Sequence, residues 1–226
     1  AARGVEFLTA YQDAAYARRY EELVEQVQAA EAPLGRSTLA ETVAKGLFRL
    51  MGYKDEYEVA RLHAETGFRE KVAAQFEGDF KVHYHLAPPL IAKKNDKGEL
   101  VKRKFGPSTY ALFRLLAKFK GLRGTPLDLF GRTDERRMER ALIEEYRQTV
   151  LELVERLTPA NHGLAVEIAN LPEQIRGYGH VKERNVAAVR PQWQRLMQQW
   201  RGGATERRAA CTRAGPPRGR RPQTLF

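Results

Sequence analysis

Hydrophobic and polar positions follow a helical spacing over most of the chain and change to strict alternation in one stretch. Within residues 75–89, apolar and polar side chains alternate one for one, with Phe80, Val82, Tyr84 and Leu86 against Lys81, His83 and His85. This alternation predicts a β-strand with one buried and one solvated face. Gly78 before it and Pro88 and Pro89 after it are natural strand ends.

A returning strand follows a polar connection. Residues 93–98 are polar and residues 100–105 can supply the second strand, so we predict one β-hairpin over about residues 80–105. An isolated two-stranded hairpin is only marginally stable. We therefore expect it to pack on helices or to join strands supplied by another part of a larger protein.

Apolar residues spaced three and four apart predict helices over most of the remaining chain. The expected helices cover residues 5–30, 38–65, 108–121, 133–157, 160–170 and 181–200, the last perturbed at Pro191. The helix at 5–30 carries an aromatic-rich stripe, which we interpret as a packing seam. Thr38 and Glu41 have the spacing of a capping box, and Thr133 is an expected N-cap. Gly46 and Gly52 indicate close helix packing or a break.

Two further segments have specific expectations. In the helix at 108–121, we expect the large apolar side chains to face inward, namely Leu112, Phe113, Leu115, Leu116 and Phe119. Residues 122–132 are too interrupted for a regular element and too apolar for a free linker, which predicts an ordered loop packed on the body.

These elements predict an α+β fold that is mostly α-helical: a helical bundle with one β-hairpin, about residues 80–105, packed on it. Residues 1–200 are expected to form a single domain. Residues 201–226 are rich in Arg, Gly and Pro and are expected to be a disordered tail. A non-native extension of the chain is one explanation for this tail.

Composition supports a globular body with a charged surface. The chain of 226 residues is 42% hydrophobic and 30% charged, and its mean hydropathy is −0.56. The net charge of +11 divides unevenly, because residues 201–226 hold seven Arg and one acid, +6, which leaves +5 for residues 1–200. The tail could serve as an arm for nucleic acid or an acidic partner, and we favour a disordered end.

Several functional classes are excluded or disfavoured. No apolar run approaches the roughly 20 residues that a bilayer requires, so we expect no membrane partner. The N-terminal residues show no signal-peptide pattern, which favours a cytoplasmic protein. A single cysteine, Cys211, excludes a disulfide framework and a cysteine-ligated cluster or zinc site within this chain.

The densest positive charge of the body lies in residues 93–123, which contain ten Lys or Arg and two acids. The candidate residues for binding an anionic partner are Lys102, Arg103, Lys104, Lys118, Lys120 and Arg123. A nucleic acid, a phosphorylated ligand or an acidic protein would suit such a surface. An exposed face that is charged only for solubility is favoured over any single ligand.

Two other features are weaker candidates. His83 and His85 share a strand face, but two ligands are too few for a metal site and no HExxH spacing supports one, so we expect no metal. Residues 177–180 (GYGH) could present backbone amides to a phosphate, yet they match no phosphate-loop pattern and a helix–helix turn is favoured. Spacing alone nominates no catalytic residue.

Long phrases carry a resemblance to a known family. They are YKDEYEVARL (residues 53–62), QFEGDFKVHYHLAPPL (75–90), FGRTDERRMERALIEEY (130–146) and LPEQIRGYGHVKERN (171–185). Together they resemble the C-terminal region of bacterial indolepyruvate ferredoxin oxidoreductase of the large fused type, a 2-oxoacid:acceptor oxidoreductase. The resemblance runs from about Phe7 to Ala188.

This resemblance implies a parent enzyme that oxidatively decarboxylates aryl pyruvates to aryl-acetyl-CoA, with ferredoxin as electron acceptor. Thiamine diphosphate, 4Fe–4S clusters and CoA are implied for that parent. Because the chain has no GDG…N motif and no CxxCxxC run, we expect it to bind none of these cofactors and carry over no catalytic residue. It would then be an accessory C-terminal domain, inactive alone, whose partners are the catalytic domains and ferredoxin.

Two alternatives belong to other classes. A basic nucleic-acid-binding module would use the hairpin, the basic helix and the tail, and its affinity would fall steeply with salt. We do not favour nucleic acid as a partner. A small metal-dependent enzyme would depend on His83 and His85.

Overall fold

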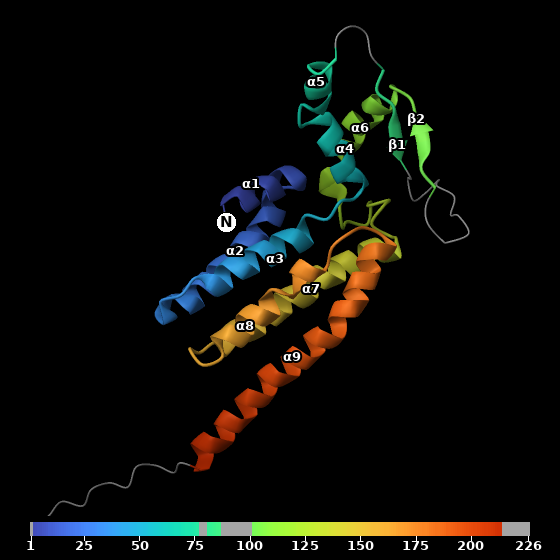
Figure 1. The fold of residues 1–226 in the computed structure, drawn as a ribbon. Coiled ribbons are helices and arrows are strands. Elements are labelled where there is room, and N and C mark those ends of the chain that lie inside the picture. The colour runs from blue at the N-terminus through green and yellow to red at the C-terminus, as the bar shows by residue number, and fades with distance from the viewer. Residues whose placement is uncertain (1, 77–80, 87–100, 214–226) are drawn as a thin grey trace, which may run out of the picture.

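The computed structural model describes residues 2–76, 81–86 and 101–213. These ranges contain nine α-helices, three short 3-10 helices and one two-stranded antiparallel sheet, which confirms the mostly helical α+β fold. Figure 1 shows a bundle of longer helices and, at one end of it, an upper region that contains the sheet.

The element bounds are as follows. The bundle consists of α1 (Ala2–Tyr11), α2 (Ala14–Glu31), α3 (Thr38–Met51), α7 (Asp134–Glu155), α8 (His162–Ala169) and α9 (His180–Arg213). The upper region consists of α4 (Glu56–Ala64), α5 (Phe68–Ala73), β1 (Tyr84–Leu86), β2 (Arg103–Phe105) and α6 (Thr109–Lys118). The 3-10 helices are η1 (Ala32–Leu34), η2 (Lys120–Leu122) and η3 (Leu171–Gln174).

The helix expected over residues 5–30 is divided in two at Asp13. The backbone of Asp13 is extended (φ −163°, ψ 176°), and its carboxylate accepts a hydrogen bond of 2.7 Å from the amide of Tyr16. An aspartate in this position stabilises a helix start. The aromatic stripe on either side of the break is buried, which confirms the packing seam: Tyr11, Tyr16 and Tyr20 are all at most 8% exposed.

The helix expected over residues 38–65 is also two elements. α3 ends at Met51, and Asp55 caps α4 by accepting a 2.8 Å hydrogen bond from the amide of Glu58. Gly46 marks close packing. A Cβ there would lie 2.7 Å from the hydroxyl oxygen of Tyr146 and 3.2 Å from the carbonyl oxygen of Ala169.

The start of α3 is capped from a distance instead of by the expected Thr38–Glu41 box. Glu31, 0% exposed, accepts hydrogen bonds of 2.8 Å from the amides of both Leu39 and Ala40. Its Oε1 also lies 2.6 Å from Nε2 of His162 on α8. One carboxylate therefore ties α2, α3 and α8 together.

The C-terminal half of the bundle follows the predicted order. Thr133 caps α7 by accepting a hydrogen bond from the amide of Arg136, as expected. α9 contains Pro191 in its interior and extends to Arg213, so the expected end at residue 200 is wrong. Residues 214–226 of the expected tail lie outside the described residues.

The upper region is built around a short hairpin. β1 and β2 pair antiparallel, with Tyr84 opposite Phe105 and His85 opposite Lys104. The alternation is confirmed where it is described, because Tyr84 is buried while His83 and His85 are exposed. The turn of the expected hairpin and Phe80 lie outside the described residues. Ala60, Tyr84 and Phe113 form the fully buried part of a small second core.

Residues 122–132 form the expected ordered loop between α6 and α7, and Arg123 and Asp128 within it are buried. In the described ranges, no helix combines the length and the apolar character needed to cross a membrane.

Candidate functional site

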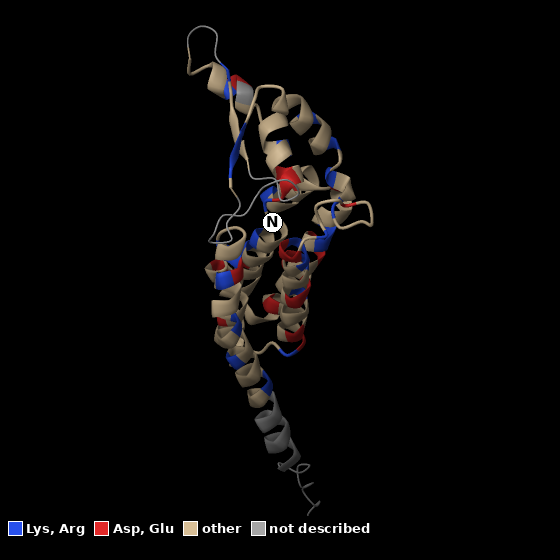
Figure 2. Cartoon of the chain, turned by 90° about the vertical axis from the view of Figure 1, so that its right-hand side faces the viewer, with Lys and Arg blue, Asp and Glu red and all other residues tan. Residues whose placement is uncertain are grey.

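Three of the six predicted cations lie in β2 or directly before it. Lys102, Arg103 and Lys104 are exposed, and they form what we call the basic strand. In Figure 2, Lys and Arg colour part of the hairpin in the upper region blue, whereas acidic and basic residues are mixed along the bundle. His85 lies opposite Lys104 on the outward face of the sheet. Lys118 at the end of α6 is also exposed.

Lys120 and Arg123 are not part of this surface, and the prediction that placed them there needs correction. Lys120 Nζ donates to the carbonyl oxygen of Ala10 at 2.7 Å and lies 3.5 Å from the carboxylate of Glu65. The side chain of Arg123 is only 3% exposed and is bound by Asp55. Both residues attach the segment after α6 to the rest of the protein.

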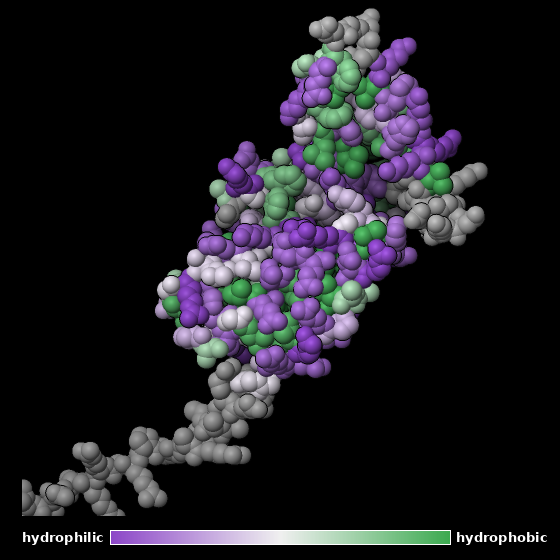
Figure 3. Space-filling view, in the orientation of Figure 1, coloured by the Kyte–Doolittle hydropathy of each residue, from purple (hydrophilic) through white to green (hydrophobic). Residues whose placement is uncertain are grey.

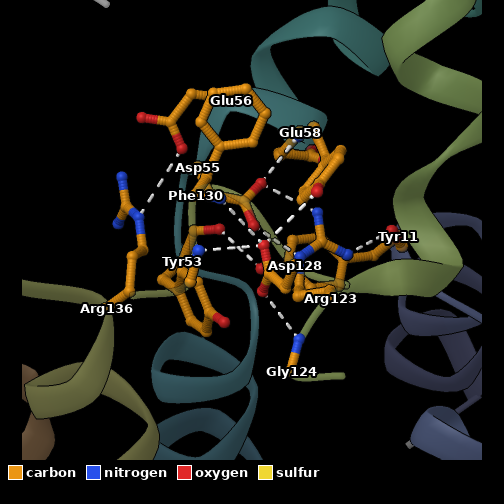
Figure 4. Close-up of polar contacts among 12 residues, drawn as sticks. Tyr11, Tyr53, Asp55, Glu56, Glu58, Arg123, Gly124, Asp128, Phe130 and Arg136 are labelled. Carbon is orange, nitrogen blue, oxygen red and sulfur yellow. Dashed lines mark hydrogen bonds and ion pairs between the residues drawn. The ribbon is translucent and has the colours of Figure 1, made fainter. Parts of the chain in front are cut away.

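Arg123 lies at the centre of a buried polar group that we call the Asp55–Arg123 cluster (Figure 4). Its Nε and Nη2 donate to the two carboxylate oxygens of Asp55, the latter at 2.8 Å, and its Nη1 donates to the carbonyl oxygen of Tyr11 at 2.7 Å. The guanidinium also stacks on the Tyr11 ring, 3.8 Å from its centroid. Such a bidentate pair fixes geometry as well as charge.

Asp128 completes the cluster by organising the loop between α6 and α7. Its carboxylate accepts hydrogen bonds from the amides of Gly124 and Gly131, both at 2.8 Å, and from the hydroxyl of Tyr57. Burial and the Asp128 charge raise the pKa of Tyr57 to about 12, so Tyr57 remains a neutral donor at physiological pH. Phe130 covers Tyr57 edge-on at 5.3 Å.

A second ionic group lies next to this cluster. Glu139 of α7 binds both Arg136 and Lys182, the latter at 2.7 Å, and Arg136 also lies 3.8 Å from Glu56. Burial lowers the pKa of Arg136, but Glu139 and Glu56 raise it by more, so the net shift is upward. Burial raises the pKa of Glu56, and the Arg136 charge offsets only part of this rise. The Oε2 of Glu56 has no hydrogen-bond partner among the described residues.

The histidine pair and the glycine turn do not form the sites considered for them. In the described part of the chain, no three His, Cys, Asp or Glu side chains come together as a metal site. The amide of Gly179, which could have bound a phosphate, donates to the carboxylate of Glu135 at 2.8 Å. The chain's own glutamate takes that position, and Gly177 (φ 95°) and Gly179 (φ 53°) form the favoured helix–helix turn.

The sequence reasoning missed an apolar surface on α6. Phe113 and Ala117 are buried, but Leu112, Leu115 and Phe119, which were expected to face inward, are 52%, 53% and 45% exposed. Their spacing of three and four places them on one face, which we call the α6 stripe. Lys118 follows Leu115 by three residues and borders it.

This helix has more apolar side chains than one face can bury. That excess is the feature of the sequence that could have predicted an exposed apolar surface. Leu127 and Leu129 in the following loop are 69% and 66% exposed as well. In Figure 3, hydrophobic residues reach the surface in the upper region beside strongly hydrophilic ones. Scattered apolar residues are normal on a surface, but a regular stripe beside basic residues is typical of a contact surface.

The structure is thus a mostly helical α+β fold whose buried charges are paired with one another. Its exposed features are the apolar α6 stripe and the basic strand. The chain belongs to a family of unknown function (DUF6537), whose profile matches residues 1–195. No curated protein and no solved structure matches the chain.

Proposed function

We propose that this chain is the accessory domain of a cytoplasmic indolepyruvate ferredoxin oxidoreductase, and that it docks on the catalytic domains through the α6 stripe. The observation that carries the docking role is the exposure of Leu112, Leu115 and Phe119 on one helical face. An apolar face of this kind is stabilised when another protein surface covers it. The link to this enzyme class rests on the sequence resemblance.

The phrases that carry the resemblance meet in space, which supports treating them as one unit. The first phrase supplies Glu56, the third supplies Arg136 and Glu139, and the fourth supplies Lys182. Arg136 contacts Glu56 and Glu139, and Lys182 contacts Glu139. The three phrases are far apart in the sequence, and these contacts join them within one fold.

The parent enzyme would supply the chemistry. Thiamine diphosphate, 4Fe–4S clusters and CoA would be bound by its catalytic domains, and this chain would be inactive alone. The basic strand would contribute a positive surface for ferredoxin, whose acidic character suits electrostatic steering.

The DNA upstream of the codon for Ala1 provides the first test. We expect an open reading frame continuous with this chain that encodes a thiamine diphosphate motif and a CxxCxxC run. A stop codon directly upstream, with no such gene nearby, would contradict the assignment to this enzyme.

The docking role is tested in the full enzyme with the double substitution Leu112→Gln/Leu115→Gln. We expect loss of association between this domain and the catalytic domains, measured by limited proteolysis at their junction and by indolepyruvate-dependent dye reduction. The isolated chain with the same substitutions should keep its melting temperature. Unchanged proteolysis and activity would reject the α6 stripe as the docking face. A matched control is Arg114→Gln, an exposed position of the same helix that is not spaced three or four residues from any member of the stripe.

The ferredoxin role is tested by neutralising the basic strand, Lys102→Gln/Arg103→Gln/Lys104→Gln, in the full enzyme. We expect a lower kcat/KM for ferredoxin and a weaker dependence of that constant on ionic strength, with dye reduction unchanged. An unchanged salt dependence would reject it.

A nucleic-acid-binding module is the alternative, and the structure weakens its basis. Lys120 and Arg123 are engaged within the fold, which leaves Lys102, Arg103, Lys104 and Lys118 as the exposed members of the predicted set. Salt-dependent DNA or RNA binding by residues 1–200 would nevertheless favour it over the docking role.

A further inference from the structure

A cavity lies beside the second ionic group, because Glu139 and Lys182 are among the residues that line it. It has a volume of about 600 Å³ and lies between α3, the turn after η3 and the first turn of α9. Volumes of roughly 300–1,000 Å³ are usual for small-molecule sites.

Four aromatic side chains contribute to the walls of this cavity, namely Phe7, Phe48, Tyr53 and Tyr178. Phe7 of α1 packs edge-on against Phe48 of α3, with ring centroids 5.2 Å apart. Tyr53 forms part of the floor at 5% exposure, and Tyr178 stands at the rim at 59% exposure. A planar apolar group would find ring faces and edges on several sides.

The charges around the cavity are unequal. Five cationic side chains line it against two carboxylates, Glu139 and Glu173. Each carboxylate is shared by two cations: Glu139 by Arg136 and Lys182, and Glu173 by Arg49 and Arg176. No carboxylate of the described residues therefore remains at this cavity for the other two lining cations.

Those two cations are Lys45 and Lys54. Lys45 is exposed and forms no ion pair among the described residues, and Lys54 Nζ lies 5.5 Å from the centroid of the Tyr178 ring. A lysine held against an aromatic ring beside an apolar hollow is positioned to bind an anionic group attached to a planar one.

The turn that carries Tyr178 has its geometry fixed by glycine. Gly177 has φ 95°, and a Cβ there would lie 2.7 Å from a methyl carbon of Val181. The rim is thus closely packed on α9. A larger hollow between α7 and α9, about 950 Å³, shows the contrast, because it is lined by three glutamates and one arginine and has no surplus of cations.

We propose that the cavity formed by Phe7, Phe48, Tyr53 and Tyr178 binds a small aromatic carboxylate, with Lys45 and Lys54 holding its carboxylate group. The aromatic ring lies against Phe48 and Tyr53, and Tyr178 covers it from the rim. No residue of the α6 stripe lines this site. The observations that support it are the lining residues and their charges, and its test does not require the proposed enzyme class to be correct.

The test uses the full chain and 2-naphthoate as probe, with chemical-shift changes of backbone amides as readout. We expect saturable shifts at residues that line the cavity, including Lys54, Gly177 and Tyr178. The neutral analogue 2-naphthamide should bind at least about tenfold more weakly, because it lacks the charge that lysine recognises. Equal binding of the two probes, or shifts located elsewhere, would overturn the proposal.

Substitutions separate a specific site from a general effect of charge. Lys45→Gln/Lys54→Gln should weaken 2-naphthoate binding at least about tenfold and leave 2-naphthamide binding unchanged. Lys71→Gln/Arg114→Gln removes the same charge from exposed positions in the upper region and should have no effect. Tyr178→Ala, at an exposed rim position, should weaken both probes. Unweakened binding by the lysine variant would overturn the proposal, as would displacement of 2-naphthoate by equimolar inorganic phosphate.

Discussion

The bundle and the upper region are held together by different forces. In the bundle, apolar residues from six helices form one continuous core in which Leu8, Tyr11 and Tyr146 are completely buried. In the described part of the upper region, the buried apolar residues are fewer, namely Tyr57, Ala60, Tyr84, Phe113 and Ala117, and several of their apolar neighbours are only partly buried. The upper region is therefore short of apolar burial for its size.

Ionic contacts fix the position of the upper region against the bundle. The Asp55–Arg123 cluster joins the start of α4 to the end of α1 and to the loop after α6. A buried ion pair adds little net stability compared with apolar packing, but it fixes one arrangement and is costly to break. The upper region is therefore positioned by ionic contacts, and part of its apolar surface remains exposed and available to a partner.

The largest expected effect comes from breaking the cluster. Arg123→Met leaves Asp55 buried without its partner, and we expect a loss of about 3–5 kcal/mol in the free energy of unfolding. Urea denaturation followed by circular dichroism measures it. The double variant Asp55→Asn/Arg123→Met should lose less than the sum of the two single variants. A loss below about 1 kcal/mol for Arg123→Met would show that the pair does not hold the two regions together.

The next effect concerns close packing in the bundle. Gly46→Ala would place a methyl group against Tyr146 and the backbone of Ala169, and we expect it to cost about 1–3 kcal/mol. Gly163→Ala in α8 is the matched control, because its Cβ would meet no atom within 4 Å. That variant should gain up to about 1 kcal/mol from helix propensity. Thermal denaturation of both variants gives the comparison, and a gain for Gly46→Ala would contradict the packing.

The two regions should also respond differently to acid. His63 in α4 lies against the rings of Phe68, Tyr84 and Phe113, its Nδ1 has no hydrogen-bond partner among the described residues, and burial lowers its pKa from 6.5. The neutral form is favoured in the folded state. Its stabilisation is thus fully present above pH 6.5 and is lost as the pH falls below 6.5 and through the lowered pKa of the folded state.

In the bundle, the stabilisation by Glu31 is lost only at a lower pH. Burial raises the pKa of Glu31, but hydrogen bonds from His162, Ala40 and Leu39 lower it to below the ordinary 4.5. Stability from Glu31 is present above pH 4.5 and is lost below it. We therefore expect amide protection in α4 and α6 to decrease between pH 7 and 5.5 while that of α3 is retained, as measured by hydrogen exchange. His63→Phe should remove the difference, and simultaneous loss in both regions would contradict it.

The smallest effect is expected on the α6 stripe. Leu112→Gln and Leu115→Gln should each change the free energy of unfolding of the isolated chain by less than about 0.5 kcal/mol, because both side chains are exposed. Phe113→Leu, one position along the same helix, should cost about 1 kcal/mol or more. Urea denaturation distinguishes them, and a large loss at Leu112 would show that the stripe belongs to the core.

The sequence predicted the fold class and most helices because apolar spacing carries that information directly. Gly52, where a break was considered, is the residue that follows the end of α3. The break at Asp13 was not predicted, because a carboxylate caps a new helix there within an uninterrupted apolar pattern. The cap on α3 was equally hidden, because Glu31 reaches it through the tertiary fold.

The candidate site was predicted only in part, for a related reason. Charge density identified the basic strand correctly as exposed, but it could not separate Arg123, which is buried with Asp55, from the exposed cations beside it. The helical pattern of α6 likewise showed that its apolar residues were too many, without showing which of them lacked a neighbour. Both distinctions depend on tertiary contacts.

The separation between Asp55 and Arg123 also matters for synthesis of the chain. Asp55 precedes Arg123 by 68 residues. At translation rates of about 5–20 residues per second, the nascent chain would carry Asp55 without its partner for roughly 3–14 s. During that interval α4 has no arginine to neutralise the carboxylate that must be buried. The N-terminal helices can thus form early, but their junction with α4 can close only after the chain beyond α6 has been made.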